Sequence, residues 1–457
     1  MVQAGAAAVE YNLLSIPNRG THIMNKESRR TFLQTAAAAV IATPARPVLG
    51  ANDRINVGIV GIGGRGRDHI DDYAKQSQCR IAAVCDVDQA GRERGMAQVE
   101  KLLSYKPKQY TDMRQLFADK EIDAVSFATP NHWHALGTIW ACQAGKDVYV
   151  EKPPSHNIYE GRKMIEAARK YQRMVQVGSQ SRSIAHIRRA VDLLGQGIIG
   201  KVYEARGLCF NPRKSIGHTP DEAVPPGVNW DLFLGPAPMR PFSRNRFHYN
   251  WHWFWDTGNG DLGNQGIHEM DKARWGLNRG LPKYVVSSGA KFLYQDDQET
   301  PNTQTAVFDY DDCRMTFDVR GLIAPGESDV RRGSEQSVGN VFYGSDGFLT
   351  LDGSGFRVYK GDKHELTMHE KPAGRDEDAP HVANFLAACR SRNYHELAAD
   401  IEIGVTSVAL VHFANASYRV GRRLKIDQAN WSVVSDAEAQ KYLTRNYRAP
   451  YVVPERV

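Results

Sequence analysis

Short apolar runs alternate with longer segments of helical character over the first part of the chain after residue 50. The apolar runs are rich in β-branched residues and cover 55–60, 80–85, 123–127, 147–150 and 174–177. Helical stretches are predicted around 68–75, 132–144 and 158–171. Alternating strands and helices are typical of a parallel sheet covered by helices. We therefore expect an α/β fold that begins with a Rossmann domain, a doubly wound parallel sheet, over residues 51–178.

The pattern changes after residue 200 to short strands separated by turn residues. The predicted strands are 202–210, 284–292, 305–310, 314–319, 340–343, 348–351 and 357–360. Such spacing favours an antiparallel sheet in a second, α+β domain over residues 179–457. Helical stretches near 381–391 and 401–420 are expected to pack back on the body of the protein.

Residues 26–43 have the pattern of an export signal, with a basic head, a short alanine-rich apolar run and then Pro44. The pair Arg29 and Arg30 resembles the twin-arginine signal that directs folded proteins to their export machinery. Met24 lies just upstream, so we expect it to be the true start and residues 1–50 to be a leader. The mature protein is then expected in the periplasm or otherwise exported, already folded around a tightly held cofactor.

Composition narrows the classes of protein. With 457 residues, 42% of them hydrophobic, the chain can build two cores. The net charge of +6 is spread among nearly as many acids as bases, which argues against nucleic acid as a partner. The six cysteines are far apart and contain no CxxC pair, so neither a disulfide framework nor a zinc knuckle is expected. Beyond the leader, no apolar run is long enough to predict a membrane span.

A GxGxxG loop follows the first predicted strand and precedes a helical stretch. Its residues are Gly61, Ile62, Gly63, Gly64, Arg65 and Gly66. Gly61 permits the tight turn, Gly63 lets the backbone approach a pyrophosphate, and Gly66 lets the helix pack on the strand. The sequence therefore predicts a dinucleotide site.

Asp86 ends the next strand, about 20 residues after the loop, where an acid accepts hydrogen bonds from the adenosine ribose. An acid at this place favours NAD over NADP. Arg65 and Arg67 keep NADP possible, because they could neutralise a further phosphate.

Two polar loops follow later strands and should meet at the carboxyl edge of the sheet, where ligands bind. One contains Thr129, Pro130 and Asn131, and the other contains Glu151 and Lys152. The proline after Lys152 favours an extended backbone, which would direct the ammonium into the crevice. A cation there can polarise a substrate hydroxyl.

Together, GxGxxG, Asp86, the segment from Thr129 to His134 and the Glu151-Lys152-Pro153 run resemble the Gfo/Idh/MocA oxidoreductases. The resemblance implies cofactor contacts for these residues, His134 included. It also implies a C-terminal domain with a large, open, mostly antiparallel sheet that covers the nicotinamide and binds a sugar, cyclitol or related polyol. Pairing of subunits through that sheet is expected, so a homo-oligomer is predicted.

The segment 247–256 interleaves aromatic and hydrogen-bonding side chains, a combination suited to a sugar. Tyr249 and Trp251 are therefore candidate substrate contacts. Gln180 and Arg182 lie in a polar turn after the last predicted Rossmann strand and are candidates for contacting substrate or cofactor.

The family's substrate motif is AspxxxHis, whose histidine is a general base. His268 matches the histidine, whereas Asn264 stands in the position of the aspartate. The two would share a helical face if the segment is helical, and Asp271 is an alternative acid that could support His268. Lys152 and His268 are thus the predicted catalytic residues. No metal is predicted, because the spacing of His248, His252 and His268 matches no familiar zinc signature.

These features predict an NAD(P)-dependent oxidoreductase that moves a hydride between nicotinamide and a secondary hydroxyl of a sugar or polyol. One alternative is an NAD-dependent glycosidase or lyase that acts through a transient keto sugar. The glycosidases of the family carry a different motif around the histidine. A second alternative is a non-catalytic sugar-binding protein that retains its nucleotide.

Overall fold

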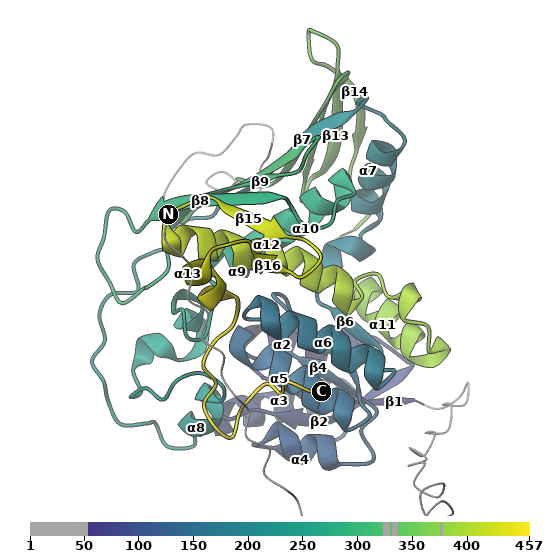
Figure 1. The fold of residues 1–457 in the computed structure, drawn as a ribbon. Coiled ribbons are helices and arrows are strands. Elements are labelled where there is room, and N and C mark those ends of the chain that lie inside the picture. The colour runs from purple at the N-terminus through teal and green to yellow at the C-terminus, as the bar shows by residue number, and fades with distance from the viewer. Residues whose placement is uncertain (1–53, 323–329, 331–336, 375–377) are drawn as a thin grey trace, which may run out of the picture. The chain divides into compact units, whose positions relative to one another are not determined.

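The structure of the protein is a computed structural model that describes residues 54–322, 330, 337–374 and 378–457 (Figure 1). The predicted leader, with Arg29 and Arg30, lies outside the described residues. Among the described helices, none combines the length and the apolar character that crossing a membrane would need.

The first sheet has six strands in the order β3-β2-β1-β4-β5-β6, and all neighbouring strands are parallel. The strands are β1 (Ile55–Val60), β2 (Cys79–Cys85), β3 (Lys108–Tyr110), β4 (Ala124–Phe127), β5 (Asp147–Val150) and β6 (Val175–Val177). The helices between them are α2 (Gly64–Ala74), α3 (Gln89–Leu103), α4 (Met113–Ala118), α5 (Asn131–Gln143) and α6 (Ile158–Lys170). Every residue of β4 and β5 is buried, as expected for parallel strands between helices. The predicted Rossmann sheet is confirmed.

The second sheet has ten strands in the order β14-β13-β12-β11-β7-β10-β9-β8-β15-β16. β7 and β10 are parallel, and the other neighbouring pairs are antiparallel. The strands are β7 (Val202–Phe210), β8 (Tyr284–Ala290), β9 (Thr303–Asp309), β10 (Arg314–Arg320), β11 (Ser337–Gly344), β12 (Gly347–Asp352), β13 (Gly355–Lys360), β14 (Glu365–Glu370), β15 (Leu424–Asp427) and β16 (Ser432–Val433). The predicted mostly antiparallel sheet is therefore confirmed.

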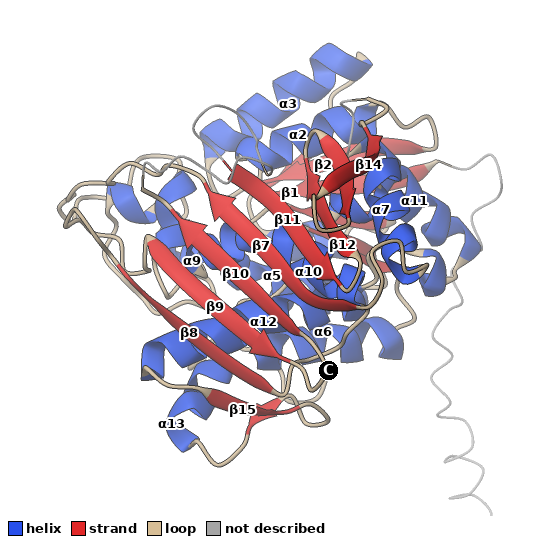
Figure 2. Ribbon diagram, turned by 90° about the horizontal axis from the view of Figure 1, so that it is seen from above, coloured by secondary structure: helices blue, strands red, loops and turns tan. Residues whose placement is uncertain are grey.

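The helices of this half are α7 (Ala185–Gly195), α8 (Trp230–Leu234), α9 (Gly260–Asn264), α10 (Gly266–Leu277), α11 (Ala379–Ser391), α12 (Ile401–Val420) and α13 (Ala437–Gln440). Of these, α10 and α12 pack on one face of the second sheet, and Figure 2 shows its strands in front of them. The short 3₁₀ helices are η1 (Gln180–Ser183), η2 (Arg244–Arg246), η3 (His248–Trp253), η4 (Tyr394–Glu396) and η5 (Lys441–Leu443).

C-terminal elements complete the cores of both sheets. Phe413 of α12 and Met270 of α10 pack in one cluster with Phe317 of β10. At the other end of α12, a Cβ on Gly404 would lie 2.4 Å from the side chain of Val177 in β6, so this helix and the first sheet are in close contact. Phe385 of α11 packs in the cluster that lies against β1 and β2. Both predicted C-terminal helices therefore pack back on the body.

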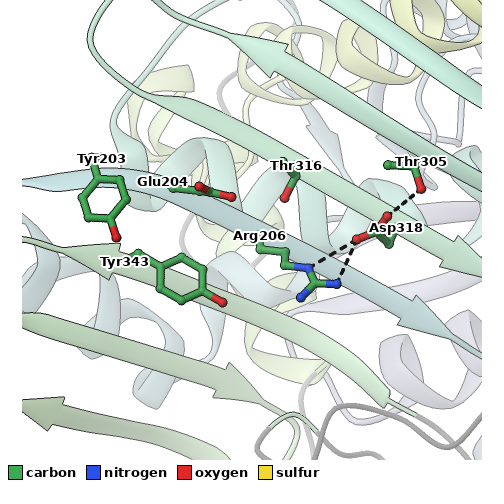
Figure 3. A pocket seen from close by; sticks show the side chains of 7 residues that line it. All are labelled: Tyr203, Glu204, Arg206, Thr305, Thr316, Asp318 and Tyr343. Carbon is green, nitrogen blue, oxygen red and sulfur yellow. Dashed lines mark hydrogen bonds and ion pairs between the residues drawn. The ribbon is translucent and has the colours of Figure 1, made fainter. Parts of the chain in front are cut away.

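The opposite face of the second sheet carries an open hollow of about 390 Å³, which Figure 3 shows from close by. Arg206 and Asp318 are paired at 3.1 Å across its floor. Their chain neighbours Ala205 and Phe317 belong to the core under α10, so the hollow lies on the other face from that helix. Its lining contains none of the predicted site residues.

Candidate active site

The glycine loop between β1 and α2 has the geometry of a phosphate cradle. Gly61 has a φ of +85°, and a Cβ on Gly66 would lie 1.8 Å from the carbonyl oxygen of Gly61. Gly63 and Gly64, in contrast, have no atom within 4 Å of a Cβ. No side chain caps the first turn of α2. The loop is thus tightly packed where Gly66 meets Gly61, and it is open at Gly63 and Gly64. Open space beside the free N–H groups of a helix start fits a pyrophosphate.

Asp86 lies directly beside this loop. One carboxylate oxygen accepts a hydrogen bond from the backbone N–H of Ile62 at 2.5 Å, and the other accepts from the N–H of Asp88 at 2.9 Å. Burial raises the pKa of Asp86, while the two N–H donors act in the opposite direction. The predicted ribose-binding acid is therefore held at the turn that follows β2.

Glu151, at the end of β5, is the centre of a buried polar network. It accepts hydrogen bonds from Nε of Arg65 at 2.9 Å and Nε2 of Gln180 at 2.9 Å, and Nε2 of His69 lies 3.1 Å away. Burial would raise the pKa of Glu151, but Arg65 and His69 outweigh it, and the pKa lies well below its ordinary value. Arg65 also pairs with Asp378 at 2.9 Å. The charge of Arg65 is thereby matched by two carboxylates of the protein, Glu151 and Asp378.

The loops after β4 and β5 are joined by His134. Its Nδ1 lies 2.8 Å from the carbonyl oxygen of Pro153, and its Nε2 lies 2.8 Å from that of Thr129. Burial lowers the pKa of His134. The hydroxyl oxygen of Thr129 is buried and has no hydrogen-bond partner among the described residues. Such an unpaired group at a strand end is suited to receive a ligand.

Pro130 caps the start of α5, and Asn131 begins the helix. The side-chain amide of Asn131 donates to the side chain of Asn259 at 3.1 Å. This hydrogen bond links a predicted cofactor loop to the residue that precedes α9.

Lys152 extends from the end of β5 to the second half of the chain. Its ammonium donates to the backbone carbonyl of Asn264, the last residue of α9, at 3.0 Å. Burial lowers the pKa of Lys152, while the nearby Glu151 raises it. The predicted catalytic lysine therefore lies at the junction between the Rossmann sheet and the helices under the second sheet.

His268 lies in the first turn of α10, close enough to Lys152 to be affected by its charge. Burial, and after it the Lys152 and Lys272 ammonium groups, hold the pKa of His268 well below its ordinary value. Among the described residues, the imidazole has no hydrogen-bond partner. A neutral imidazole next to a cation can accept a proton from a bound hydroxyl.

The proposed support of His268 by Asp271 is wrong. Both carboxylate oxygens of Asp271 accept from Arg182 at 2.8 Å, and Ser407 donates to one of them. Arg182 also lies over the ring of Trp275 at 4.8 Å. The polar groups of Arg182 are therefore used to hold α10 in place, and Gln180 holds Glu151 in a similar way.

Asn264 and His268 do not belong to a single helix, because Gln265 separates α9 from α10. The Asn264 amide donates instead to the hydroxyl of Tyr249 at 3.2 Å and to Asp261 at 3.4 Å. Arg213 pairs with Asp261 at 3.0 Å and approaches the Tyr249 hydroxyl at 3.4 Å. The sequence reasoning missed Arg213 and Asp261.

The remaining aromatic candidate, Trp251, packs on the edge of the cluster formed by Trp230, Phe233 and Phe247. Its ring stacks on that of His252 at 3.5 Å. Tyr249 therefore contacts the side chain of Asn264. Trp251 instead packs against the aromatic cluster.

A Rossmann sheet with a phosphate cradle, joined to a second sheet through polar strand-end loops, defines an NAD-binding oxidoreductase. Residues 55–179 match the family described as "oxidoreductase family, NAD-binding Rossmann fold". Residues 183–321 and 339–453 match the description "oxidoreductase family, C-terminal alpha/beta domain". The chain belongs to the Gfo/Idh/MocA oxidoreductase family, as its motifs predicted, and its cofactor is NAD.

Known proteins resemble the chain at different levels. A glycosyl hydrolase family 109 protein of Shewanella pealeana is 29% identical over 174 residues, which are 32% of this chain and 38% of that relative. The chain therefore matches less than half of that relative's length. A levoglucosan dehydrogenase solved with NADH and levoglucosan has a TM-score of 0.63 at 16% identity, over 82% of this chain and 100% of the other. The WlbA dehydrogenase of Chromobacterium violaceum, solved with NADH and UDP-GlcNAcA, has a TM-score of 0.62 at 18% identity, over 83% and 97%. These two structural similarities show that the chain has the same fold as the two dehydrogenases.

Proposed function

We propose that this protein is an NAD-dependent dehydrogenase that acts on a secondary hydroxyl of a sugar, cyclitol or related polyol. The observation that carries the proposal is that Lys152, at the carboxyl edge of the Rossmann sheet, donates to the carbonyl of Asn264, four residues before His268. Lys152 comes from the loop after β5 and His268 from α10, and the carbonyl of Asn264 holds the lysine where α9 and α10 meet.

Each residue has a defined role in the oxidation. His268 accepts the proton of the substrate hydroxyl, and the Lys152 ammonium stabilises the negative charge that develops on the oxygen. NAD held by the glycine loop and Asp86 would supply the hydride acceptor that the oxidation of an alcohol to a carbonyl group needs. Because the pKa of His268 is lowered, the imidazole is neutral before the reaction and can take up that proton.

The groups beside this pair favour an uncharged polyhydroxy compound. Tyr249, Asn264 and Asp261 offer hydroxyl, amide and carboxylate groups that suit sugar hydroxyls. The charge of Arg213 is already matched by Asp261 at 3.0 Å, so this arginine fits the role of a positioning residue better than that of a partner for an acidic sugar.

The test is a panel of neutral sugars, anhydrosugars and cyclitols added to purified protein with NAD, with the absorbance of NADH as the readout. A dehydrogenase produces NADH in proportion to the oxidised product. Uronic acids of the same ring size form the comparison set and should be poorer substrates. Absence of NADH formation with every member of the panel would contradict the proposal.

A second candidate is a glycosidase that oxidises a sugar transiently and reduces the product again. The similarity to the Shewanella glycosyl hydrolase family 109 protein favours it, over the aligned third of the chain. The same panel, extended to nitrophenyl glycosides, separates the two activities. A glycosidase would release nitrophenol without net NADH formation, whereas the proposed dehydrogenase would form NADH without releasing nitrophenol.

We also propose that the protein is exported through the twin-arginine route and works as a homo-oligomer. The paired Arg29 and Arg30 support export, and the open face of the second sheet, where Tyr203 is 51% exposed, supports subunit pairing. Light scattering after size-exclusion chromatography tests the oligomer, because a mass of one chain would contradict it.

A further inference from the structure

A segment from the second half of the chain pairs with the turn that carries the ribose-binding acid. The N–H of Asn229 donates to the carbonyl of Val87 at 3.0 Å, and the N–H of Gln89 donates to the carbonyl of Gly227 at 3.0 Å. Asp88 and Val228 form an antiparallel bridge between these hydrogen bonds. Residues 227–229 are therefore paired with the turn after β2 through an isolated β-bridge.

Gly227 is required for this close pairing. Its φ is +83°, and a Cβ on it would lie 3.1 Å from the Cβ of Gln89. A larger residue would meet both backbone strain and a steric conflict at this position. The geometry thus depends on a residue that the nucleotide motif itself does not contain.

An aromatic cluster holds the same segment against the turn. The rings of Trp230 and Phe233 are stacked at 4.9 Å, Phe247 lies 4.9 Å from Phe233, and the partly buried Val87 packs against the cluster. The turn after β2 is therefore fixed by apolar packing as well as by backbone hydrogen bonds.

His248 follows Phe247 of this cluster in the chain, and its side chain lies near the turn that carries Asp86. Its Nε2 lies 3.7 Å from the carboxylate of Asp88. The backbone N–H of Asp88 in turn donates to a carboxylate oxygen of Asp86. The backbone of His248 has a φ of +53°, and its ring centroid lies 3.8 Å from that of Phe247. Its side chain is 58% exposed, so packing alone does not account for this strained position.

We propose that residues 227–229 and His248 form a clasp over the adenosine half of NAD, with His248 as a nucleotide-binding residue beside Asp86. The clasp slows release of the nucleotide. His248 also directly precedes Tyr249, whose hydroxyl accepts from the side-chain amide of Asn264. The segment that closes over the adenosine therefore continues into the proposed substrate site.

The test measures nucleotide release without any turnover. The full-length protein is loaded with NADH and mixed with excess NAD, and the loss of NADH fluorescence gives the release rate. His248→Ala should raise this rate about tenfold, the effect of one lost polar contact to a ligand. Gly227→Val should raise it as well, because it separates residues 227–229 from the turn.

A matched control is available in the turn between β13 and β14. His364 is also exposed, has a φ of +52° and contacts a phenylalanine, with its ring 5.3 Å from that of Phe348. His364→Ala should leave the release rate unchanged, which separates the loss of a strained histidine from the loss of the clasp.

Competition with fragments of the cofactor locates the effect. In His248→Ala, the affinity of AMP should fall about tenfold, while the affinity of nicotinamide mononucleotide should be unchanged. An unchanged NADH release rate with unchanged AMP affinity would overturn the proposal. Equal weakening of both fragments would overturn it too, because it would indicate a general disturbance of the site. Neither result depends on which sugar the enzyme oxidises.

Discussion

Asn264 contacts both halves of the proposed site with different atoms. Its backbone carbonyl accepts from the Lys152 ammonium at 3.0 Å, and its side-chain amide donates to the Tyr249 hydroxyl at 3.2 Å. The residue that replaces the usual aspartate of the family motif therefore positions the proposed catalytic cation, Lys152, and the proposed substrate-binding residue Tyr249. This explains how the site can keep its geometry although the imidazole of His268 lacks a carboxylate partner.

Lys152 and His268 should affect the rate and spare nucleotide binding. We expect Lys152→Ala and His268→Ala each to lower kcat by about a hundredfold or more, the usual scale of acid–base contributions. NAD binding, followed by titration, should change little, because the glycine loop and Asp86 are proposed to hold most of the nucleotide. Full turnover in His268→Ala would assign the base to another group, and Tyr249 and His252 would be examined next.

The pH dependence of kcat/KM should reflect the lowered pKa of His268. Burial and the neighbouring Lys152 and Lys272 ammonium groups disfavour the protonated imidazole, so the base form persists below the ordinary histidine pKa of about 6.5. Activity should therefore fall only at lower pH. Asn264→Asp adds a negative charge nearby and should move this acid limb to higher pH. An acid limb at or above the ordinary value in the parent protein would contradict the assignment.

The residues of the site differ in how far the sequence could predict them. The glycine loop and Asp86 have a fixed spacing, because one turn of backbone must hold one pyrophosphate and one ribose. Arg213 and Asp261 meet across 48 positions of chain through the fold of the second half, and no local pattern indicates such a contact. Asp271 was misassigned for the same reason, since its partner Arg182 is 89 positions away.

At the scale of elements, two glycines at the junction of β1 and α2 should affect different properties, Gly66 the stability and Gly63 the binding of NAD. Gly66→Ala would place a Cβ 1.8 Å from the Gly61 carbonyl oxygen, so it should lower the free energy of unfolding by about 1–3 kcal/mol, as overpacking does. Gly63→Ala meets no atom within 4 Å. Its unfolding free energy should stay within about 0.5 kcal/mol of the parent, while NAD binding weakens because the methyl group occupies the phosphate approach.

Thermal unfolding and NAD titration of both variants check this separation. Equal loss of stability in the two variants would show that the open space over Gly63 is not a ligand position. Unchanged NAD binding in Gly63→Ala would lead to the same conclusion.

Whole elements could be predicted where burial imposes a strong pattern. β7 and α12 have the predicted bounds, because their residues pack on buried surfaces along most of their length. β3 and β14 were missed: β3 has three largely polar residues, and β14 is mostly exposed at the edge of its sheet. Edge strands need little apolar surface, so their sequences lack the signal on which such predictions depend.

At the scale of the whole molecule, residues 447–457 pack against the half of the protein that contains the first sheet. Val453 and Val457 pack in the same core cluster as β4 and β5, and the hydroxyl of Tyr447 donates to Glu160 in α6 at 3.2 Å. Arg448 and Tyr451 both bind Asp231 next to the proposed clasp. The residues from Tyr447 to Val457 therefore contribute to the packing of the Rossmann core.

The proposed twin-arginine signal would export the protein already folded and loaded with NAD. We expect Arg29→Lys combined with Arg30→Lys to leave NAD-loaded protein in the cytoplasm, because the receptor reads the guanidinium pair and not charge alone. Cell fractionation, followed by measurement of protein and bound NAD in each fraction, checks this. Arg46→Lys, in the same proposed leader but outside the pair, is the matched control and should be exported like the parent. Undiminished export of the double variant would rule out the twin-arginine route, and exported parent protein without NAD would separate export from cofactor loading.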